Sequence, residues 1–183
     1  MQVIAGKYKG RKLISLDTID TRPTLARVKE SMFAMIDEFI YDANVLDLFA
    51  GSGALGIECV SRGAKEVVFV DNNPQYKNIL EKNLARVTEK YYIFNDNFNN
   101  ALTNLSKKNS KFDIVFLDPP YNSDLGDQAI NLLCHLKLLS KGAIIVYEQD
   151  SKKCLQNAPE LFIIRKSKKY GLAQVTILEY IGE

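Results

Sequence analysis

The chain has 183 residues, of which 46% are hydrophobic and 25% charged, and its formal net charge of +2 is ordinary for one soluble α/β domain. Its three cysteines, Cys59, Cys134 and Cys154, form no CxxC pattern, so the sequence predicts neither a disulfide framework nor a metal site. We find no signal peptide and no apolar run of about 18 residues, and therefore expect a cytoplasmic protein.

The N-terminal part predicts a small extension. Residues 2–16 read as two short extended segments, a β-hairpin around the turn-forming Gly6 and Gly10. A helix over 24–40 is expected after Pro23, because apolar residues then recur at helical spacing. We assign residues 1–40 to this extension and residues 41–183 to the main domain.

The rest of the chain alternates apolar strands with amphipathic helices. Strands are expected over 45–49, 66–70, 91–94, 113–117 and 143–147, and helices over 54–61, 74–87, 98–107 and 125–139. This order is typical of a mostly parallel sheet covered by helices on both faces. Strand-like runs over 161–166 and 174–180, separated by residues 168–172, predict an antiparallel C-terminal hairpin. The fold class is therefore α/β and Rossmann-like, with a seven-stranded sheet.

Charge is unevenly distributed along the chain. Residues 1–30 hold seven basic and three acidic residues, residues 152–171 hold six basic and one acidic, and residues 31–151 hold 11 basic and 16 acidic. Basic segments near both ends of the chain and an acidic central segment have two interpretations. Either a polyanionic partner docks at the edge of the domain, or the basic side chains simply face solvent.

A glycine loop follows the first predicted strand. Gly51, Gly53 and Gly56 form a GxGxxG pattern, and Asp71 lies 20 residues after Gly51, where a carboxylate can accept hydrogen bonds from ribose hydroxyls. NAD and S-adenosylmethionine both fit this pattern. Asp47 favours S-adenosylmethionine, because a carboxylate beside the loop repels a pyrophosphate but attracts a methionyl ammonium. Asp96 is placed either to meet the adenine amine or to cap a helix. The residues expected to bind the cofactor are Asp47, Phe49, Gly51, Ser52, Gly53, Gly56, Asp71, Asn72, Asp96 and Asn97.

The most specific motif is Asp118-Pro119-Pro120-Tyr121, directly after the fourth predicted strand. Two prolines stiffen the loop. The Asp118 carboxylate and the Pro119 carbonyl are adjacent acceptors that match the two N–H bonds of an exocyclic amine, and Tyr121 offers a face on which a base can stack. We therefore expect methyl transfer to such an amine, with these four residues forming the catalytic site.

This order of motifs looks like that of class I methyltransferases acting on exocyclic amines. The segments 5–13, 21–33, 46–56 and 117–121 resemble the RsmD family of bacterial methyltransferases, which modify guanine N2 in small-subunit ribosomal RNA; Ala26 departs from the acidic residue usual there. The resemblance implies a monomer that acts on ribosomal RNA within a small subunit or an assembly intermediate. It also implies that the basic residues near both ends contact RNA phosphates: Lys7, Lys9, Arg11, Lys12, Arg22, Arg27, Lys29, Lys168 and Lys169.

Three alternative functions stay open at this point. A DNA adenine-N6 methyltransferase would share the motif but usually carries a larger recognition region. A nicotinamide-dependent dehydrogenase would leave the two prolines unexplained, and a non-catalytic RNA-binding protein would leave Asp118 unexplained. Among single residues, we interpret Glu148 as a surface carboxylate at a strand end rather than a wall of the base pocket, and Tyr8 and Phe33 as packing residues.

Overall fold

The computed structural model of the chain describes residues 1–16, 23–120, 123–152 and 160–182. The predictions made for Arg22 and Tyr121 lie outside these residues, as does Cys154. No helix in the described part of the chain is long and apolar enough to cross a membrane.

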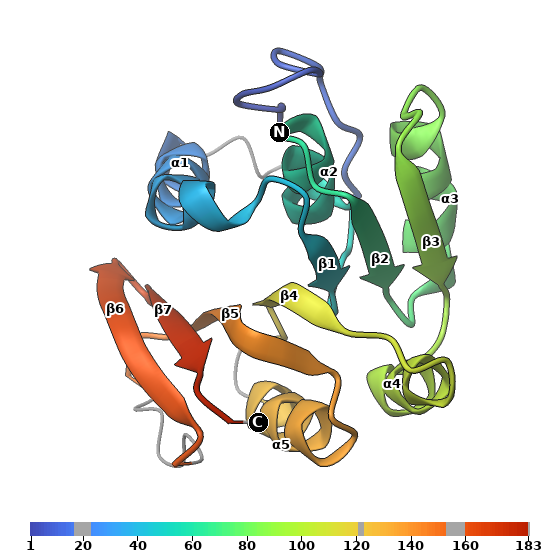
Figure 1. Cartoon of the computed structure of the whole chain (residues 1–183). Helices are drawn as coiled ribbons and strands as arrows, with labels where there is room; N and C mark the ends of the chain where they lie inside the picture. Colours follow the sequence, from blue (N-terminus) through green and yellow to red (C-terminus); the bar gives the residue numbers. More distant parts are fainter. Residues whose placement is uncertain (17–22, 121–122, 153–159, 183) are drawn as a thin grey trace.

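Among the described residues, seven strands form one sheet in the order β3-β2-β1-β4-β5-β7-β6 (Figure 1). Strands β1 to β5 run parallel, and β7 pairs antiparallel with both β5 and β6. The predicted sheet and its antiparallel C-terminal hairpin are therefore confirmed. The strands are β1 Asn44–Asp47, β2 Glu66–Val70, β3 Lys90–Phe94, β4 Phe112–Leu117, β5 Leu139–Asp150, β6 Phe162–Tyr170 and β7 Ala173–Tyr180.

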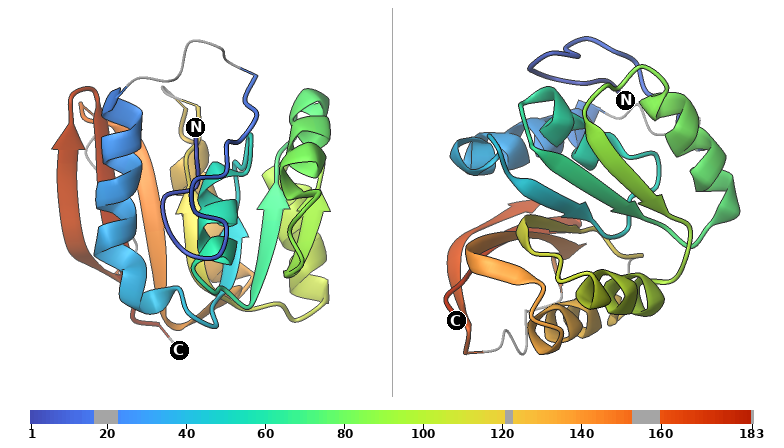
Figure 2. Two further views of the ribbon diagram at one scale, coloured as in Figure 1. Left: turned by 90° about the horizontal axis from the view of Figure 1, so that it is seen from above. Right: turned by 45° about the vertical axis from the view of Figure 1, so that its right-hand side comes forward.

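Helices cover both faces of the sheet (Figure 2). Successive residues of a strand point to opposite faces, so Val45 packs into the cluster that holds Phe33 and Ile57, while Leu46 packs with Leu102 and Leu133. One layer thus contains α1 Pro23–Ile36, α2 Ala54–Ser61 and α3 Pro74–Leu84, and the other contains α4 Phe98–Lys107 and α5 Leu125–His135.

Several predicted boundaries were wrong. The helix expected over 125–139 ends at His135, because Lys137 has a left-handed φ of 53° and Leu139 already begins β5. The helix expected over 24–40 ends at Ile36 and is followed by a 3-10 turn, η1 Asp37–Phe39, and the helix expected over 74–87 ends at Leu84. Strand β6 continues to Tyr170, so the hairpin turn is shorter than residues 168–172.

The first 16 residues fold onto the main domain without forming regular strands. Their two extended segments meet in an isolated antiparallel bridge between Gln2 and Lys12, while Val3 and Leu13 are buried in the core shared with the sheet. Gly6 has a φ of 79°, and a Cβ there would lie 1.8 Å from the Ser61 carbonyl oxygen, so the segment touches α2 backbone to backbone. The extension and the main domain therefore share one core.

Strand β6 forms an edge of the sheet. Its residues 163–169 are exposed, including Ile163 and Ile164 and the basic residues Arg165, Lys166, Lys168 and Lys169. Helix α1 lies beside the β6–β7 hairpin (Figures 1 and 2). The Tyr170 hydroxyl donates to the Ser31 hydroxyl, and Lys168 Nζ lies 3.4 Å from the same oxygen, so these contacts fix the hairpin against α1.

Candidate active site

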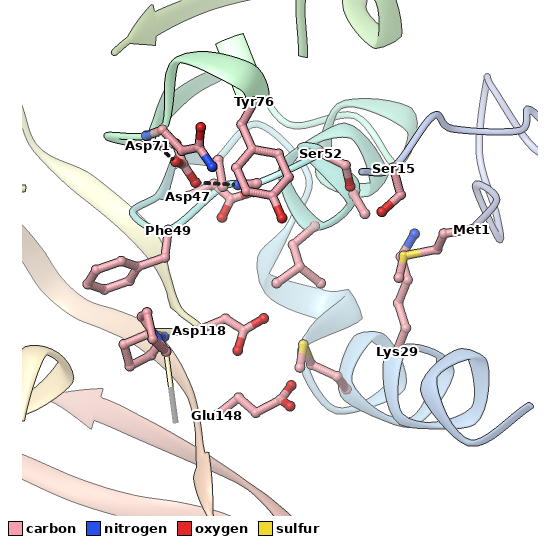
Figure 3. Close-up of a pocket in the computed structure, with 18 of the residues that line it drawn as sticks. Met1, Ser15, Lys29, Asp47, Phe49, Ser52, Asp71, Tyr76, Asp118 and Glu148 are labelled. Carbon is pink, nitrogen blue, oxygen red and sulfur yellow. Dashed lines mark hydrogen bonds between the residues drawn. The ribbon is translucent and has the colours of Figure 1, made fainter. Parts of the chain in front are cut away.

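A pocket of about 610 Å³ lies at the carboxyl ends of the central strands. Strand β1 has β2 on one side and β4 on the other, so the strand order reverses beside β1. The pocket lies at this point, which is the usual ligand site of open α/β sheets. Four carboxylates from four strands or strand ends face it: Asp47, Asp71, Asp118 and Glu148 (Figure 3). Val28, Lys29 and Met32 of α1, together with Ser15, form the opposite wall.

The glycine loop has one part that lines the pocket and another part that packs against neighbouring side chains. Gly51, with a φ of 51°, lines the pocket with Phe49 and Ser52. Gly53 and Gly56 do not line it. Gly53 has a φ of 78° at the start of α2, and a Cβ on Gly56 would lie 2.3 Å from Phe69 Cε1. Gly56 thus allows α2 to pack closely on the sheet, and the cofactor contacts expected of Gly53 and Gly56 stay predictions.

Asp71 links the second strand to the glycine loop. Its Oδ2 accepts a hydrogen bond from the Gly51 N–H (2.8 Å), and its Oδ1 accepts from the Asn73 N–H (2.8 Å). Each carboxylate oxygen can accept more than one bond, so Asp71 can still receive the hydroxyls of a ribose. Asn72, as predicted, and Asn73 both line the same wall.

Tyr76, in the first turn of α3, was missed by the sequence analysis. Its ring lines the pocket, and a Cβ on Gly51 would be 3.7 Å from Tyr76 Cε1 (Figure 3). It follows Asp71 by five residues and lies in the first turn of the next helix, and this place after a strand end is the signal that could have identified it.

Asp47 is buried and serves the fold as well as the pocket. Its Oδ2 accepts a hydrogen bond from the Gly56 N–H at 3.0 Å, so it holds the first turn of α2. The pKa of Asp47 is raised to about 7, mainly by loss of hydration and partly by the nearby Asp71 charge, while the Gly56 bond and the Lys29 charge act in the opposite direction. Both interpretations of Asp47, as a structural cap and as a partner for a cationic ligand, are compatible with this position.

Asp118 and Glu148 lie on neighbouring strands. In the β4–β5 register, Leu117 pairs with Tyr147, so the next residues, Asp118 and Glu148, follow side by side. Asp118 is open to the pocket, but its reduced hydration there raises its pKa well above the usual range, and the Glu148 charge raises the pKa further. Pro119 and Pro120 line the pocket next to Asp118. Our interpretation of Glu148 as a surface carboxylate was wrong, since it lines this pocket.

Asp96 and Asn97 lie at the start of α4 and do not line the pocket. Asn97 caps the helix, its side chain accepting from the Asn100 N–H at 2.9 Å. Asp96 Oδ1 accepts from the Asn97 N–H at 2.7 Å and from Asn100 Nδ2 at 3.0 Å. The adenine contact expected of Asp96 stays a prediction.

Lys29 is not on the molecular surface, so its predicted contact with RNA phosphates was wrong. It is 4% exposed, and its Nζ lies 2.9 Å from Glu58 Oε2 on α2. Glu58 is fully buried and also accepts from the Ile4 N–H at 2.8 Å, the Ala5 N–H at 3.0 Å and Arg62 Nε at 2.9 Å. These bonds join the N-terminal segment, α1 and α2 at one point.

The remaining basic candidates lie in two groups. Lys9 and Lys12 are exposed on the N-terminal segment, where Lys7 Nζ pairs with Glu89 Oε1 at 2.6 Å and the Arg11 guanidinium lies 5.9 Å from the Tyr8 ring centroid. Arg27 on α1 and Lys168 and Lys169 on β6 are exposed on the neighbouring α1–β6 part of the molecule. Tyr8 and Phe33 pack against the core as predicted.

Comparison with known proteins gives consistent matches over nearly the whole chain. Residues 1–179 match the sequence model of the family described as conserved hypothetical protein 95. Ribosomal RNA small subunit methyltransferase D of Haemophilus influenzae is 37% identical over 98% of this chain and 93% of its own length. The Escherichia coli protein of the same name is 35% identical over 93% of this chain and 85% of its own.

Solved structures agree with these sequence matches. An Escherichia coli structure described as a candidate methyltransferase superposes with a TM-score of 0.88 at 30% identity, covering 100% of this chain and 99% of that one. A Haemophilus influenzae structure described as a candidate methylase gives a TM-score of 0.82 at 36% identity, over 99% and 98% of the two chains. The fold is thus that of class I methyltransferases, and the chain belongs to the family of conserved hypothetical protein 95, the RsmD family that its motifs resemble.

Proposed function

We propose that this protein transfers a methyl group from S-adenosylmethionine to the exocyclic N2 amine of a guanine in small-subunit ribosomal RNA. The observation that supports this most directly is the position of Asp118, Pro119 and Pro120 in the same pocket as the glycine loop and Asp71. The relatives named as small-subunit ribosomal RNA methyltransferases supply the substrate class.

The pocket residues fit S-adenosylmethionine. A volume of about 610 Å³ suits a ligand of that size. Asp71 would hold the ribose hydroxyls, and Asp47 would face the methionyl ammonium, while the left-handed backbone of Gly51 lets the ligand approach the loop closely. A buried carboxylate beside the loop disfavours the pyrophosphate of NAD, which counts against a dehydrogenase. When bound, the cofactor supplies a methyl group made electrophilic by its sulfonium.

Asp118 and Pro119 would orient the amine. The Asp118 carboxylate and the Pro119 carbonyl accept the two N–H bonds, which directs the nitrogen lone pair away from them and toward the methyl group. The Asp118 carboxylate would stabilise the positive charge that develops on the nitrogen as it accepts the methyl group. The nitrogen then loses one proton, and because this loss can follow methyl transfer, no strong general base is required.

The exposed basic residues would position the RNA. Lys9, Lys12, Arg27, Lys168 and Lys169 are available for phosphates near the pocket-forming elements α1 and the N-terminal segment. We propose that the protein acts as a monomer on a small subunit or an assembly intermediate, and therefore in the cytoplasm. Guanine N2 is accessible only when the nucleotide is unpaired or flipped out.

The test is transfer of labelled methyl groups from S-adenosylmethionine to small ribosomal subunits that lack the modification, followed by digestion to nucleosides. We expect N2-methylguanosine from the native protein and a loss of about 100-fold or more in rate for Asp118→Ala. Glu81→Gln, on the exposed side of α3, is the matched control and should leave the rate unchanged.

Other products have defined meanings. N6-methyladenosine would keep the chemistry and overturn the guanine assignment. No transfer to subunits, free RNA, DNA or protein, with intact binding of S-adenosylmethionine, would support the non-catalytic alternative.

A further inference from the structure

We propose that Glu148 selects guanine over other bases by accepting the N1–H of the guanine edge while Asp118 and Pro119 hold the N2 amine. This inference rests on the proposed function, and it assigns to Glu148 a contact that methyl transfer to an amine does not itself require.

The sheet geometry brings the two carboxylates to the same side. Leu117 and Tyr147 are neighbours in the β4–β5 register and both pack into the α4–α5 layer, where the Tyr147 hydroxyl donates to Asp127 on α5. Side chains alternate along a strand, so the next residues, Asp118 and Glu148, point to the opposite face. Figure 3 shows both carboxylates directed into the pocket between β4, β5 and α1.

Neighbouring strands of a sheet lie about 4.8 Å apart. Side chains that leave neighbouring strands so close together can converge on adjacent donors at the edge of one ligand. Guanine has such an edge, because its N1–H and its N2 amine are neighbours and both donate. Adenine does not, because its amine stands beside N1, which is an acceptor. A carboxylate facing that nitrogen would leave two acceptors opposed without a proton between them.

Asp118 and the two prolines alone cannot make this distinction. An exocyclic amine of adenine and one of guanine present the same two N–H bonds to Asp118 and Pro119. The second acceptor, the Glu148 carboxylate, would contact the ring nitrogen N1 beside the amine. Hydrogen-bonded pockets of this kind can discriminate strongly against a ligand that lacks the matching donor.

The charges around the pocket agree with a donor-rich ligand. Among the described residues that line the pocket, Lys29 carries a cationic side chain; it is ion-paired with Glu58 at 2.9 Å, and its Nζ also lies 3.3 Å from the Gln2 carbonyl oxygen. Its charge is thus directed toward α2 rather than toward Asp118 and Glu148. Two carboxylates side by side repel each other, and N–H donors from a base relieve that repulsion.

The experiment replaces the target guanosine, once mapped in the methylated subunits, by 2-aminopurine. This base keeps the 2-amine but has an unprotonated N1. We expect the wild-type protein to methylate it at least about 100-fold less efficiently in kcat/KM than guanosine. Glu148→Gln should lower the ratio of kcat/KM for guanosine to kcat/KM for 2-aminopurine at least about tenfold. The amide can donate to the unprotonated N1 and no longer requires a donor from the base.

A second readout needs no methyl transfer. The fluorescence of 2-aminopurine rises when the base leaves its stack, so titration of the substituted subunits reports binding directly. We expect Glu148→Gln to bind them more tightly than the wild type does. Its binding of S-adenosylmethionine and its melting temperature should match the wild type, with Glu81→Gln as the control for removal of a carboxylate elsewhere.

The outcomes separate the two levels of the hypothesis. A wild-type protein that makes N2-methylguanosine but treats 2-aminopurine and guanosine alike overturns this inference alone, and that measurement needs no variant. An unchanged ratio in folded Glu148→Gln also overturns it alone. Absence of N2-methylguanosine from the native reaction overturns the proposed function and this inference together.

Discussion

At the scale of single residues, Asp47 combines burial, a helix contact and a place in the pocket wall. Its pKa is raised to about 7 in the folded protein by loss of hydration, whereas in the unfolded chain it would titrate near its ordinary pKa of 3.8. The folded state therefore holds the proton more tightly. The stability that this group contributes is fully present below pH 3.8 and disappears as pH rises through about 7.

Cofactor binding should show the opposite dependence on pH. Above about pH 7 the Asp47 carboxylate is charged and attracts the methionyl ammonium, and below it the neutral acid does not. We therefore expect the affinity for S-adenosylmethionine to rise as pH increases through about 7, by roughly tenfold for about 1.4 kcal/mol of attraction. Isothermal titration at a series of pH values measures this, and Asp47→Asn should flatten the profile. A wild-type profile as flat as that of Asp47→Asn would contradict the assignment.

Asp71 and Lys29 show what residue patterns can and cannot predict. The place of Asp71 in the pocket follows from its position at the end of a strand, which the alternation of apolar residues fixes. Lys29 sits among basic residues in the sequence but turns inward, because it pairs with Glu58, 29 residues away on α2. Such an ion pair depends on how two helices pack, and no local pattern contains that information.

At the scale of elements, the contact between α2 and β2 depends on Gly56. A Cβ there would lie 2.3 Å from Phe69 Cε1 and 2.9 Å from Val67 Cγ1. Gly56→Ala would push α2 away from the sheet and lengthen the bond from Gly56 N–H to Asp47. We expect a decrease of about 1–3 kcal/mol in the free energy of unfolding, measured by urea denaturation.

A compensating substitution provides the control for this prediction. Phe69→Leu removes the ring that the new methyl group would meet, so the double variant should be destabilised by less than the sum of the single changes. Strict additivity would mean that the ring is not the cause.

Element types were easier to predict than element ends. Near-continuous apolar runs bounded by Gly, Pro and Asp identified strands β1 to β5 and the helices between them. The apolar residues Leu136, Leu138 and Leu139, however, suit the end of a helix as well as the start of a strand. In the structure, the left-handed backbone at Lys137 separates the helix from the strand. Lysine is not a residue type that predicts such a conformation. The pocket position of Glu148 was missed because it depends on which neighbour β5 pairs with, a property of the whole sheet.

At the scale of the whole molecule, Arg27, Lys168 and Lys169 should contribute to RNA affinity as a group. The triple change of these residues to glutamine should weaken binding to small subunits. It should also reduce the slope of log affinity against log salt concentration, by about 0.7–0.9 for each phosphate that the variant no longer neutralises. Filter binding between about 50 and 200 mM salt measures this slope.

The matched control removes the same charge from another part of the surface. Three exposed lysines lie near the amino ends of β4 and β5, whereas the pocket lies at the carboxyl ends of the strands: Lys107, Lys137 and Lys141. Their change to glutamine should leave the salt slope close to that of the wild type. Equal effects of the two triple variants would indicate attraction by net charge rather than a defined surface.

The basic residues of β6 also affect how molecules of this protein meet one another. An edge strand carries unpaired backbone groups that can extend a sheet into a second molecule, and exposed Ile163 and Ile164 would favour such pairing. The charges of Arg165, Lys166, Lys168 and Lys169 oppose it, because two β6 edges brought together would set like charges against each other. The composition of one strand thus serves colloidal solubility as well as attraction to a polyanion.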